Sequence, residues 1–393
     1  MDNIERFREA FPAVRKCLYF GTAGVGPLPQ VALDRMAAAA DRLRGDFTWN
    51  AWEEDLPAEA RQLAAALIGA APERVALTHS TSEGINLLAG GYPWRAGDGV
   101  ILNPLEYPAN VTPWLYQAER NALDVRVVPA KGHEIPVEDL IAAIDSRTRV
   151  LAVSHVEFGA GFRHDLLRLA DAIHEEGGLL CVDAIQSIGA LAVDVEALGI
   201  DVLATGGYKW LCGPLGTGFA YVRDAVAAEL HPPTMDYANL QESTYGRVWD
   251  SLVTGADVEM SCSPRALDRR RFEGEGWSPV LMSGLAASLR LLLDVGIDAI
   301  AARIESLVSY AIDGLARCAL PILSPTDPAK RSGIVTIGIP QNLRDPAQVK
   351  AVDQRMKDAK LVAFLRGGGL RLAIHAFNTE QEIDAAIDFV ASL

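Results

Sequence analysis

The sequence has no long hydrophobic run. No apolar stretch approaches about 18 residues, the length that a membrane-spanning helix requires. The N-terminal segment, MDNIERFREAFPAVRK, is charged from its second residue and contains neither the apolar stretch nor the small-residue cleavage site of a secretory signal. We therefore expect a cytoplasmic protein without membrane association.

Cysteine pairs and metal-ligand patterns are also missing. The five cysteines form no CxxC pair, and their odd number does not suggest a disulfide framework, so we expect reduced thiols. They are Cys17, Cys181, Cys212, Cys262 and Cys318. The seven histidines show neither an HExxH motif nor metal-ligand spacing. No metal site is expected.

Two further absences limit the choice of ligand. The glycine clusters GVGPLP, GAGFRH, GPLGTG and GEGWSP all miss the dinucleotide fingerprint GxGxxG, which argues against a nicotinamide enzyme. The formal net charge of −15 is spread along the chain without an acidic tail, which argues against nucleic acid and against an anionic membrane surface. A small-molecule partner fits this composition better.

What the sequence does contain is an alternation of β-rich apolar runs with helical patterns. The runs lie at 75–77, 100–102, 125–128, 150–153, 179–182, 202–204 and 219–222. Segments between them, such as 137–145 and 165–176, have apolar residues at helical spacing. This alternation predicts an α/β fold in which a mostly parallel sheet is covered by helices on both faces.

A second, smaller α/β unit is predicted towards the C-terminus. Residues 284–318 have the pattern of one long or broken helical stretch that connects two domains. It is followed by a predicted strand at 333–337, a helix at 346–360, a strand near 370–373 and a final helix from about 379. No repeat and no low-complexity linker separates the two units, so we expect tightly joined domains.

An aspartate and a lysine stand at the ends of two neighbouring predicted strands. Asp183 closes the run 179–182 in the sequence DAIQ, and Lys209 follows the run 202–204 through TGGYKW. Pyridoxal phosphate needs a lysine amine to hold its aldehyde as a Schiff base and a carboxylate to keep its ring nitrogen protonated. A lone aspartate in the position of Asp183 more often caps the next turn. Lys209, however, opens the apolar stretch KWLC, and a buried lysine needs either a charged partner or an environment that removes its charge. The pair predicts pyridoxal phosphate.

Other positions suit the same cofactor and an amino acid substrate. Thr81 and Ser82 follow the strand VALT and begin a helix, where unpaired N–H groups attract phosphate, although an N-cap is the alternative. Tyr107, in LEYPAN, has a ring that can stack on the cofactor or pack in the core. Arg371, in GGGLRLA, is a candidate clamp for a substrate carboxylate, and spacing alone does not exclude a surface arginine.

At these residues the chain resembles the class V aminotransferase family of fold type I pyridoxal-phosphate enzymes. The family includes cysteine desulfurases, selenocysteine lyases, kynureninases and isopenicillin N epimerases. The motif DxxQ followed by YKWLCGPLGTG carries the resemblance, which runs from YFGTAGVGP at residue 19 to RLAIHAFNTEQEID at residue 371. It implies a large domain with a mostly parallel seven-stranded sheet, a smaller C-terminal α/β domain, and a homodimer with active sites at the interface. The expected bounds are an N-terminal arm at 1–30 packing with the small domain, the large pyridoxal-phosphate-binding domain at 31–283, and the small domain at 284–393.

The resemblance also implies a role for each site residue. Lys209 would form the Schiff base, Asp183 would pair with the pyridine nitrogen, and Gln186 would reach the ring hydroxyl. Thr81 and Ser82 would bind the phosphate. Tyr107 would occupy the ring-stacking position, and Arg371 would bind the substrate carboxylate. The chain departs from the desulfurases at Tyr208, where they often have histidine. Kynureninases have tyrosine there, which makes Tyr208 a candidate phosphate ligand. Phe158 stands where desulfurases place an asparagine near the ring.

The predicted function is that of a pyridoxal-phosphate enzyme acting on an amino acid through an external aldimine and an α-carbanion. The favoured reaction is carbon–sulfur cleavage by β-elimination. Transamination and epimerisation are the alternatives within the family, and a non-catalytic binding protein that keeps the fold is the alternative outside it. Desulfurases take the sulfur onto a mobile C-terminal cysteine, whereas residues 319–393 contain none here. We therefore expect a free sulfur product and no enzyme-bound persulfide.

Overall fold

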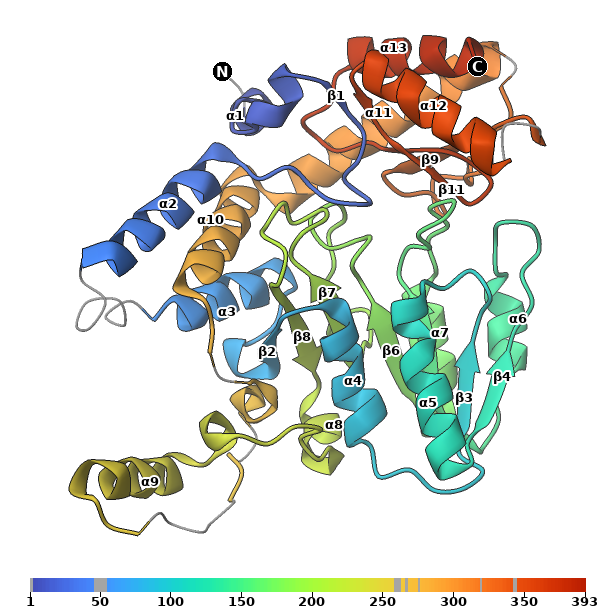
Figure 1. Cartoon of the computed structure of the whole chain (residues 1–393). Helices are drawn as coiled ribbons and strands as arrows, with labels where there is room; N and C mark the ends of the chain where they lie inside the picture. Colours follow the sequence, from blue (N-terminus) through green and yellow to red (C-terminus); the bar gives the residue numbers. More distant parts are fainter. Residues whose placement is uncertain are drawn as a thin grey trace.

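A seven-stranded sheet organises the larger part of the chain, and a smaller unit lies at one end of it (Figure 1). The structure is a computed structural model that describes residues 3–45, 55–257, 263–265, 268–274, 276–318, 320–341 and 345–393. The strands of the large sheet are β2 (Val75–Thr78), β3 (Gly99–Leu102), β4 (Asp124–Val127), β5 (Thr148–Ser154), β6 (Leu179–Asp183), β7 (Val202–Gly206) and β8 (Gly218–Val222).

The order of the strands places a ligand crevice at their carboxyl ends. The sheet runs β2-β8-β7-β6-β5-β3-β4, and only β8 is antiparallel to its neighbours. The chain proceeds outwards from β3 to β4 on one side and from β5 through β6 to β7 on the other. Open α/β sheets bind ligands where the strand order reverses in this way, at the carboxyl ends. The predicted mostly parallel seven-stranded sheet is confirmed.

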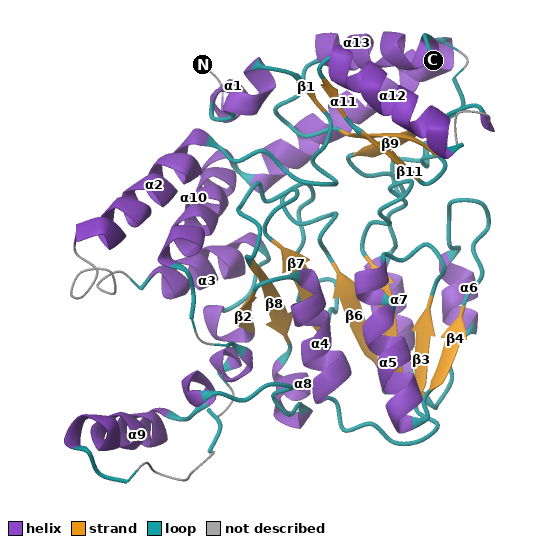
Figure 2. Cartoon of the chain, viewed as in Figure 1, coloured by secondary structure: helices purple, strands orange, loops and turns teal. Residues whose placement is uncertain are grey.

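Helices cover both faces of the sheet (Figure 2). One buried apolar cluster joins the sheet to α4 (Thr81–Gly91), α5 (Thr112–Asn121) and α8 (Asp224–Glu229). The other joins the opposite face to α3 (Leu56–Leu67), α6 (Val137–Ala142), α7 (Leu166–Glu175) and α10 (Pro279–Val295). Because both faces are buried, the inner strands are mostly continuous apolar runs, whereas the edge strand β4 is partly exposed. Two more helices of the large domain are α2 (Gln30–Gly45) and α9 (Glu242–Thr254).

The described residues from α11 onwards, which we call the small domain, form a three-stranded antiparallel sheet and three helices. Its sheet has the order β11-β12-β9. The elements are α11 (Ile297–Arg317), β9 (Ile334–Gly338), α12 (Pro346–Asp358), β10 (Leu361–Val362), β11 (Phe364–Arg366), β12 (Gly369–Ala373) and α13 (Glu380–Ala391). The helical stretch predicted at 284–318 is two helices, α10 and α11, which bend by 77° at the break between them. In the described residues no single helix has the length and apolar character of a membrane span, and this bent pair reaches them only when both helices are counted together.

The N-terminal segment lies against the small domain. After α1 (Asn3–Glu9), β1 (Leu18–Tyr19) pairs in parallel with β10. The backbone then reaches the C-terminal end of β12, where Gly21 bridges to Ala373. The short 3-10 helices in the described part of the chain are Pro12–Arg15, Pro72–Arg74, Pro108–Asn110, Tyr237–Asn239 and Arg269–Phe272. This course brings residues 23–26 to the carboxyl ends of the large sheet, where a cavity of about 220 Å³ lies between the two domains.

Candidate active site

Lys209 lies in a tight turn that directly follows β7. The turn closes through the bonds from Gly213 N to Gly207 O and from Cys212 N to Lys209 O. Its other side is covered by the N-terminal segment, because Gly26 N donates to Tyr208 O. A Cβ on Gly26 would stand 2.0 Å from the Lys209 carbonyl oxygen, so only glycine permits this approach. The backbone around Lys209 is therefore fixed by two distant parts of the chain.

Burial changes the proton affinity of Lys209. The side chain is buried, and burial lowers the pKa of its amine to about 8; Asp183 raises this pKa and Arg371 lowers it. The amine lies 5.5 Å from the ring centre of Tyr107 and 5.9 Å from that of Tyr208. An amine with this pKa is partly unprotonated near neutral pH, which nucleophilic and proton-transfer chemistry requires.

Asp183 presents an unsatisfied carboxylate oxygen. Its Oδ1 accepts a hydrogen bond from Ile185 N at 3.0 Å, whereas Oδ2 is buried and has no partner among the described residues. Burial raises the pKa of Asp183 to about 6, against the lowering effects of the Ile185 bond and of Lys209. A buried oxygen of this kind is costly unless something donates to it. The protonated pyridine nitrogen of pyridoxal phosphate is a donor of the right kind.

The start of α4 has free polar groups suited to a phosphate. Ser80 is the N-cap and accepts from Glu83 N, which places Thr81 and Ser82 within the first turn. Thr81 Oγ1 is buried and lacks a partner in the described part of the chain. Just outside the helix, the His79 ring stacks on Trp277 at 4.4 Å. Ser80 thus engages the N–H group of Glu83, and the N–H groups of Thr81 and Ser82 remain available for an anion.

Two hydrogen bonds orient the side-chain amide of Gln186. Trp210 Nε1 donates to Oε1 at 2.8 Å, and Nε2 donates to Ala23 O at 3.0 Å. One N–H of this amide has no partner among the described residues, and Gln186 lines the 220 Å³ cavity. The amide can therefore donate a hydrogen bond to a ring hydroxyl oxygen. Tyr208 lines the same cavity, whereas Thr81 and Ser82 do not.

Tyr107 is a half-exposed residue over the cavity rather than a core residue. Its side chain is 47% exposed, and its ring meets that of Phe158 edge to face at 5.3 Å. Phe158 follows β5 and Tyr107 follows β3, so the two rings lie on either side of the point where the strand order reverses. The half-exposed ring of Tyr107 is therefore accessible for stacking on a planar ligand next to the Lys209 amine.

Arg371, on β12, is a buried cation without a carboxylate partner in the described part of the chain. Its Nη1 donates to Phe158 O at 2.5 Å, and its Nε is buried and unpartnered. Burial, together with the nearby Arg366, lowers the pKa of this guanidinium to about 10. An isolated buried charge is strongly unfavourable. Arg371 is therefore not a surface arginine, and an anion in the cavity would complete its coordination.

Sequence reasoning did not identify a pair of buried glutamates behind the site. Asn103 Nδ2 donates to Glu106 Oε1 at 3.0 Å and to Glu157 Oε1 at 2.9 Å, and His164 Nε2 lies 3.0 Å from the latter oxygen. Burial raises the pKa of Glu157 to about 8 and that of Glu106 well above its usual value. Their only sequence signal is an acid placed shortly after a predicted strand, in PLEYPAN and in SHVEFG.

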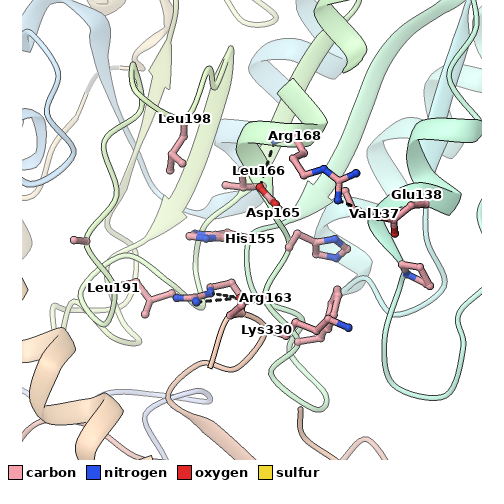
Figure 3. Close-up of a pocket in the computed structure, with 15 residues that line it drawn as sticks. Val137, Glu138, His155, Arg163, Asp165, Leu166, Arg168, Leu191, Leu198 and Lys330 are labelled. Atoms are coloured by element: carbon pink, nitrogen blue, oxygen red, sulfur yellow. Dashed lines mark hydrogen bonds and ion pairs between the residues drawn. The ribbon is translucent and has the colours of Figure 1, made fainter. Parts of the chain in front are cut away.

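A second, larger cavity of about 560 Å³ is lined by His155, among other residues (Figure 3). It shares no lining residue with the first cavity. Its cations are already engaged: Arg163 donates to the carbonyls of Pro328 and Ala329, Arg168 to Glu138, and Lys330 to Glu134. We therefore assign the site chemistry to the smaller cavity and a structural role to Arg163, which joins the two domains.

Comparison with protein families gives one match over nearly the whole chain. The family model described as aminotransferase class-V matches residues 19–385. A probable cysteine desulfurase of Methanothermobacter thermautotrophicus is 31% identical over 97% of this chain and 96% of its own length. A cysteine desulfurase of Salmonella gallinarum is 29% identical over 86% of this chain and 82% of its own.

Solved structures share the fold. The apo structure of a cysteine desulfurase from Thermococcus onnurineus aligns with a TM-score of 0.84 and 23% identity, covering 99% of this chain and 98% of that one. A complex of the cystine C–S lyase C-DES with its product, cysteine persulfide, aligns with a TM-score of 0.86 and 22% identity, covering 98% and 99%. At these identities the likeness concerns the fold.

Proposed function

This chain belongs to the class V aminotransferase family of pyridoxal-phosphate enzymes, and from that premise we propose that it is a carbon–sulfur lyase acting on an amino acid. The observation that carries the proposal is the buried pair formed by Lys209 and Asp183 at the ends of β7 and β6. The amine of Lys209 has a lowered pKa, and Asp183 has a buried oxygen without a partner among the described residues. A structural ion pair would have neither property, because its two charges would satisfy each other.

The described residues fit the cofactor at both of its ends. Pyridoxal phosphate, when bound, withdraws electrons from the α-carbon of an amino acid and so stabilises negative charge there. Asp183 would hold the proton on the ring nitrogen, and the first turn of α4 with Thr81 and Ser82 would hold the phosphate. Gln186 would donate to the ring hydroxyl, and Tyr107 would stack on the ring. Tyr208 is a further candidate for the phosphate.

Lys209 and Arg371 would contact the substrate. Arg371 would bind the α-carboxylate, which supplies the anion that its buried guanidinium lacks. This contact fixes the orientation of the α-carbon relative to Lys209. The Lys209 amine, with a pKa of about 8, would accept the α-proton and could return it to another atom. Burial excludes water that would compete for that proton.

The choice of β-elimination is supported by the relatives and by the cysteines of this chain. The curated relatives are named cysteine desulfurases, and one structural neighbour is a cystine C–S lyase. None of the described cysteines lines the cavity. Cys262 lies outside the described residues. Because no described thiol lines the cavity, direct elimination is the simpler reaction.

Product analysis tests the reaction type. The holoenzyme is incubated with cysteine, cystine and cysteine thioethers, and keto acid, ammonia and the sulfur product are quantified. Lyase activity gives all three in equal amounts without an added amino acceptor. A requirement for a keto acid acceptor would instead establish the aminotransferase alternative. Racemisation without ammonia would establish the epimerase alternative, and absence of any cofactor-dependent reaction would favour a binding protein.

We further propose a homodimer, as in the family. The helix α9 supports it, because its side chains Trp249, Leu252 and Val253 are more than half exposed. Exposed apolar groups of this size on one helix favour association with another surface, and a second copy is the occupant we expect. Light scattering on the purified protein measures the mass directly. A monomer of 42.2 kDa at micromolar concentration would contradict the proposal.

A further inference from the structure

Trp210 connects the cavity to the small domain. Its side chain is buried, and its ring stacks on that of His375, with 5.6 Å between the ring centres and 24° between the ring planes. His375 follows β12 of the small domain. A Cβ on Gly333, which precedes β9, would stand 2.5 Å from Trp210 Cη2, so the small domain also closes against the far edge of the indole. The small domain therefore holds the indole ring in place.

The backbone of Trp210 is held by the same histidine. Ala376 N donates to His375 Nδ1 at 2.8 Å, so Nδ1 is an acceptor and the proton of the neutral ring is on Nε2. That Nε2 lies 3.2 Å from Trp210 O and donates to it. Burial lowers the pKa of His375 to about 4, against the raising effect of the Trp210 bond, so the ring is neutral. His375 thus fixes Trp210 at both its ring and its carbonyl.

The indole N–H of Trp210 determines which way the amide of Gln186 is turned. Trp210 Nε1 can only donate, so the amide atom 2.8 Å from it is Oε1 of Gln186. Ala23 O can only accept, so the amide atom 3.0 Å from it is Nε2. A flipped amide would face its oxygen to the Ala23 carbonyl and its NH2 group to the indole N–H, and both contacts would be repulsive. The second N–H of the amide is left for a ligand in the cavity that Gln186 lines.

The choice of partner for this indole is informative. A buried tryptophan N–H needs an acceptor, and a backbone carbonyl is sufficient, as at Trp94, whose Nε1 donates to Ala89 O at 2.8 Å. Trp210 instead donates to a side chain that lines the cavity. A hydrogen bond accepted by an amide oxygen polarises the amide and strengthens its N–H donors. Trp210 therefore both orients Gln186 and makes it a better donor.

We propose that Trp210 is a positioning residue: its indole N–H, held by His375 of the small domain, keeps an N–H of Gln186 turned towards the ring hydroxyl of the cofactor. The inference rests on the proposed function, because it concerns the cofactor site that this function requires. An amide fixed as a donor favours the deprotonated ring oxygen, which only accepts, over the neutral hydroxyl. The small domain thereby influences the charge on the ring through two side chains.

Two ligands that differ only in the ring hydroxyl test this role. Pyridoxine phosphate and 3-deoxypyridoxine phosphate lack the aldehyde that would react with Lys209, so equilibrium dialysis with the full-length apoprotein measures binding alone. We expect the wild type to prefer pyridoxine phosphate by about tenfold, the effect of one hydrogen bond to a charged acceptor. The preference should fall to about threefold or less in Trp210→Phe. Trp94→Phe, which loses an indole bond of the same length, should keep it.

A double-mutant cycle shows whether Trp210 acts through Gln186. Gln186→Met should bind the two ligands equally, and the addition of Trp210→Phe should not change their ratio further. His375→Phe keeps a stacked ring but loses the bond to Trp210 O, so it should also lower the preference, and it decides the question if Trp210→Phe does not fold. A loss of affinity that is the same for both ligands would overturn the inference, because the indole would then serve packing alone.

The holoenzyme gives a second measurement that needs no turnover. Donation to the ring oxygen draws electron density from the cofactor, so the midpoint of the pH-dependent change in its visible absorbance should move to higher pH in Trp210→Phe. A reduced ligand preference and a moved midpoint without cleavage of any sulfur amino acid would support this inference while the lyase function fails. Lyase activity with the same preference and midpoint in wild type and Trp210→Phe would overturn the inference while the lyase function stands.

Discussion

At the scale of single residues, Asp183 has a buried oxygen without a partner among the described residues, which is costly unless the cofactor donates to it, as we propose. Asp183→Asn keeps the size of the side chain but removes the negative charge that holds a proton on the ring nitrogen. We expect turnover to fall by about a hundredfold or more, the usual effect of removing one electrostatic stabiliser of developing charge. Cofactor content, measured by absorbance, should fall much less. A variant with bound cofactor and near wild-type turnover would contradict the role of Asp183.

Lys209 is the residue that we expect to carry the cofactor. Treatment of the holoenzyme with borohydride followed by peptide mapping should find the pyridoxyl group on Lys209, because this lysine is buried and has a pKa of about 8. Lys209→Ala should lose the visible absorbance of the bound cofactor. Lys330→Ala, which removes a lysine paired with Glu134, is the control and should keep it. Label on a different lysine would show that the assignment is wrong.

Glu157 should make the stability of the protein depend on pH. Its pKa is raised from 4.5 to about 8 in the folded state, chiefly by burial, so folding favours the protonated form. The contribution of Glu157 to the free energy of unfolding is therefore greatest below about pH 4.5 and falls as the pH rises towards 8. Each pKa unit corresponds to about 1.4 kcal/mol, so the fall amounts to several kcal/mol.

The variant Glu157→Gln tests this dependence. Glutamine stays neutral and can keep the hydrogen bonds to Asn103 and His164. Denaturant unfolding between pH 5 and 9 should show a weaker loss of stability in this variant than in the wild type. Glu176→Gln, at an exposed position, should behave like the wild type. Identical pH profiles for Glu157→Gln and the wild type would mean that Glu106 alone holds the buried proton.

At the scale of elements, the loop after β5 connects the two domains. Arg163 N donates to Lys330 O at 2.7 Å, Ser332 Oγ donates to Gly161 O, and Thr336 Oγ1 donates to Gly159 O. The same loop contributes Phe158, whose carbonyl accepts from Arg371. The position of the carboxylate clamp therefore depends on close packing between this loop and β9.

Gly161 is a tight point of that packing. Its φ is +76°, and a Cβ there would lie 2.6 Å from Ile334 Cβ. Gly161→Ala should lower the free energy of unfolding by about 2–4 kcal/mol, since both backbone strain and a clash in a packed interior contribute. Gly132→Ala is the matched control, because its φ is +67° and no atom lies within 4 Å of the added methyl group. Equal losses in the two variants would show that the interdomain contact is not tight.

At the scale of the whole molecule, no described cysteine is placed to carry sulfur. Cys181 and Cys212 are buried, and burial raises the pKa of both thiols, whereas Cys17 and Cys318 do not line the cavity. Intact-protein mass after turnover with a sulfur amino acid should therefore show no added sulfur atom. A variant with every cysteine replaced by alanine should keep its activity. Added sulfur together with inactivity of that variant would restore the desulfurase mechanism.

The sequence by itself determined the class of fold and the family. Strand and helix patterns are local, and parallel strands have their carboxyl ends on one edge of the sheet, so Asp183 and Lys209 could be placed together from their positions after two predicted strands. The α/β class and the family are confirmed by the structure and by the family match. The individual roles of Lys209, Asp183, Gln186, Tyr208 and the other site residues stay predictions.

Only the tertiary structure decided which buried polar side chains have hydrogen-bond or ion-pair partners among the described residues and which do not. The cap of α4 is Ser80 rather than Thr81, and Arg371 is buried without a carboxylate. Glu106 and Glu157 meet through Asn103, although they come from different strand ends. Arg366 shares a face with Arg371 because of the register of a hairpin, which a shift of one residue would reverse. Hydrogen-bond satisfaction and register are long-range properties, so local sequence patterns do not contain them.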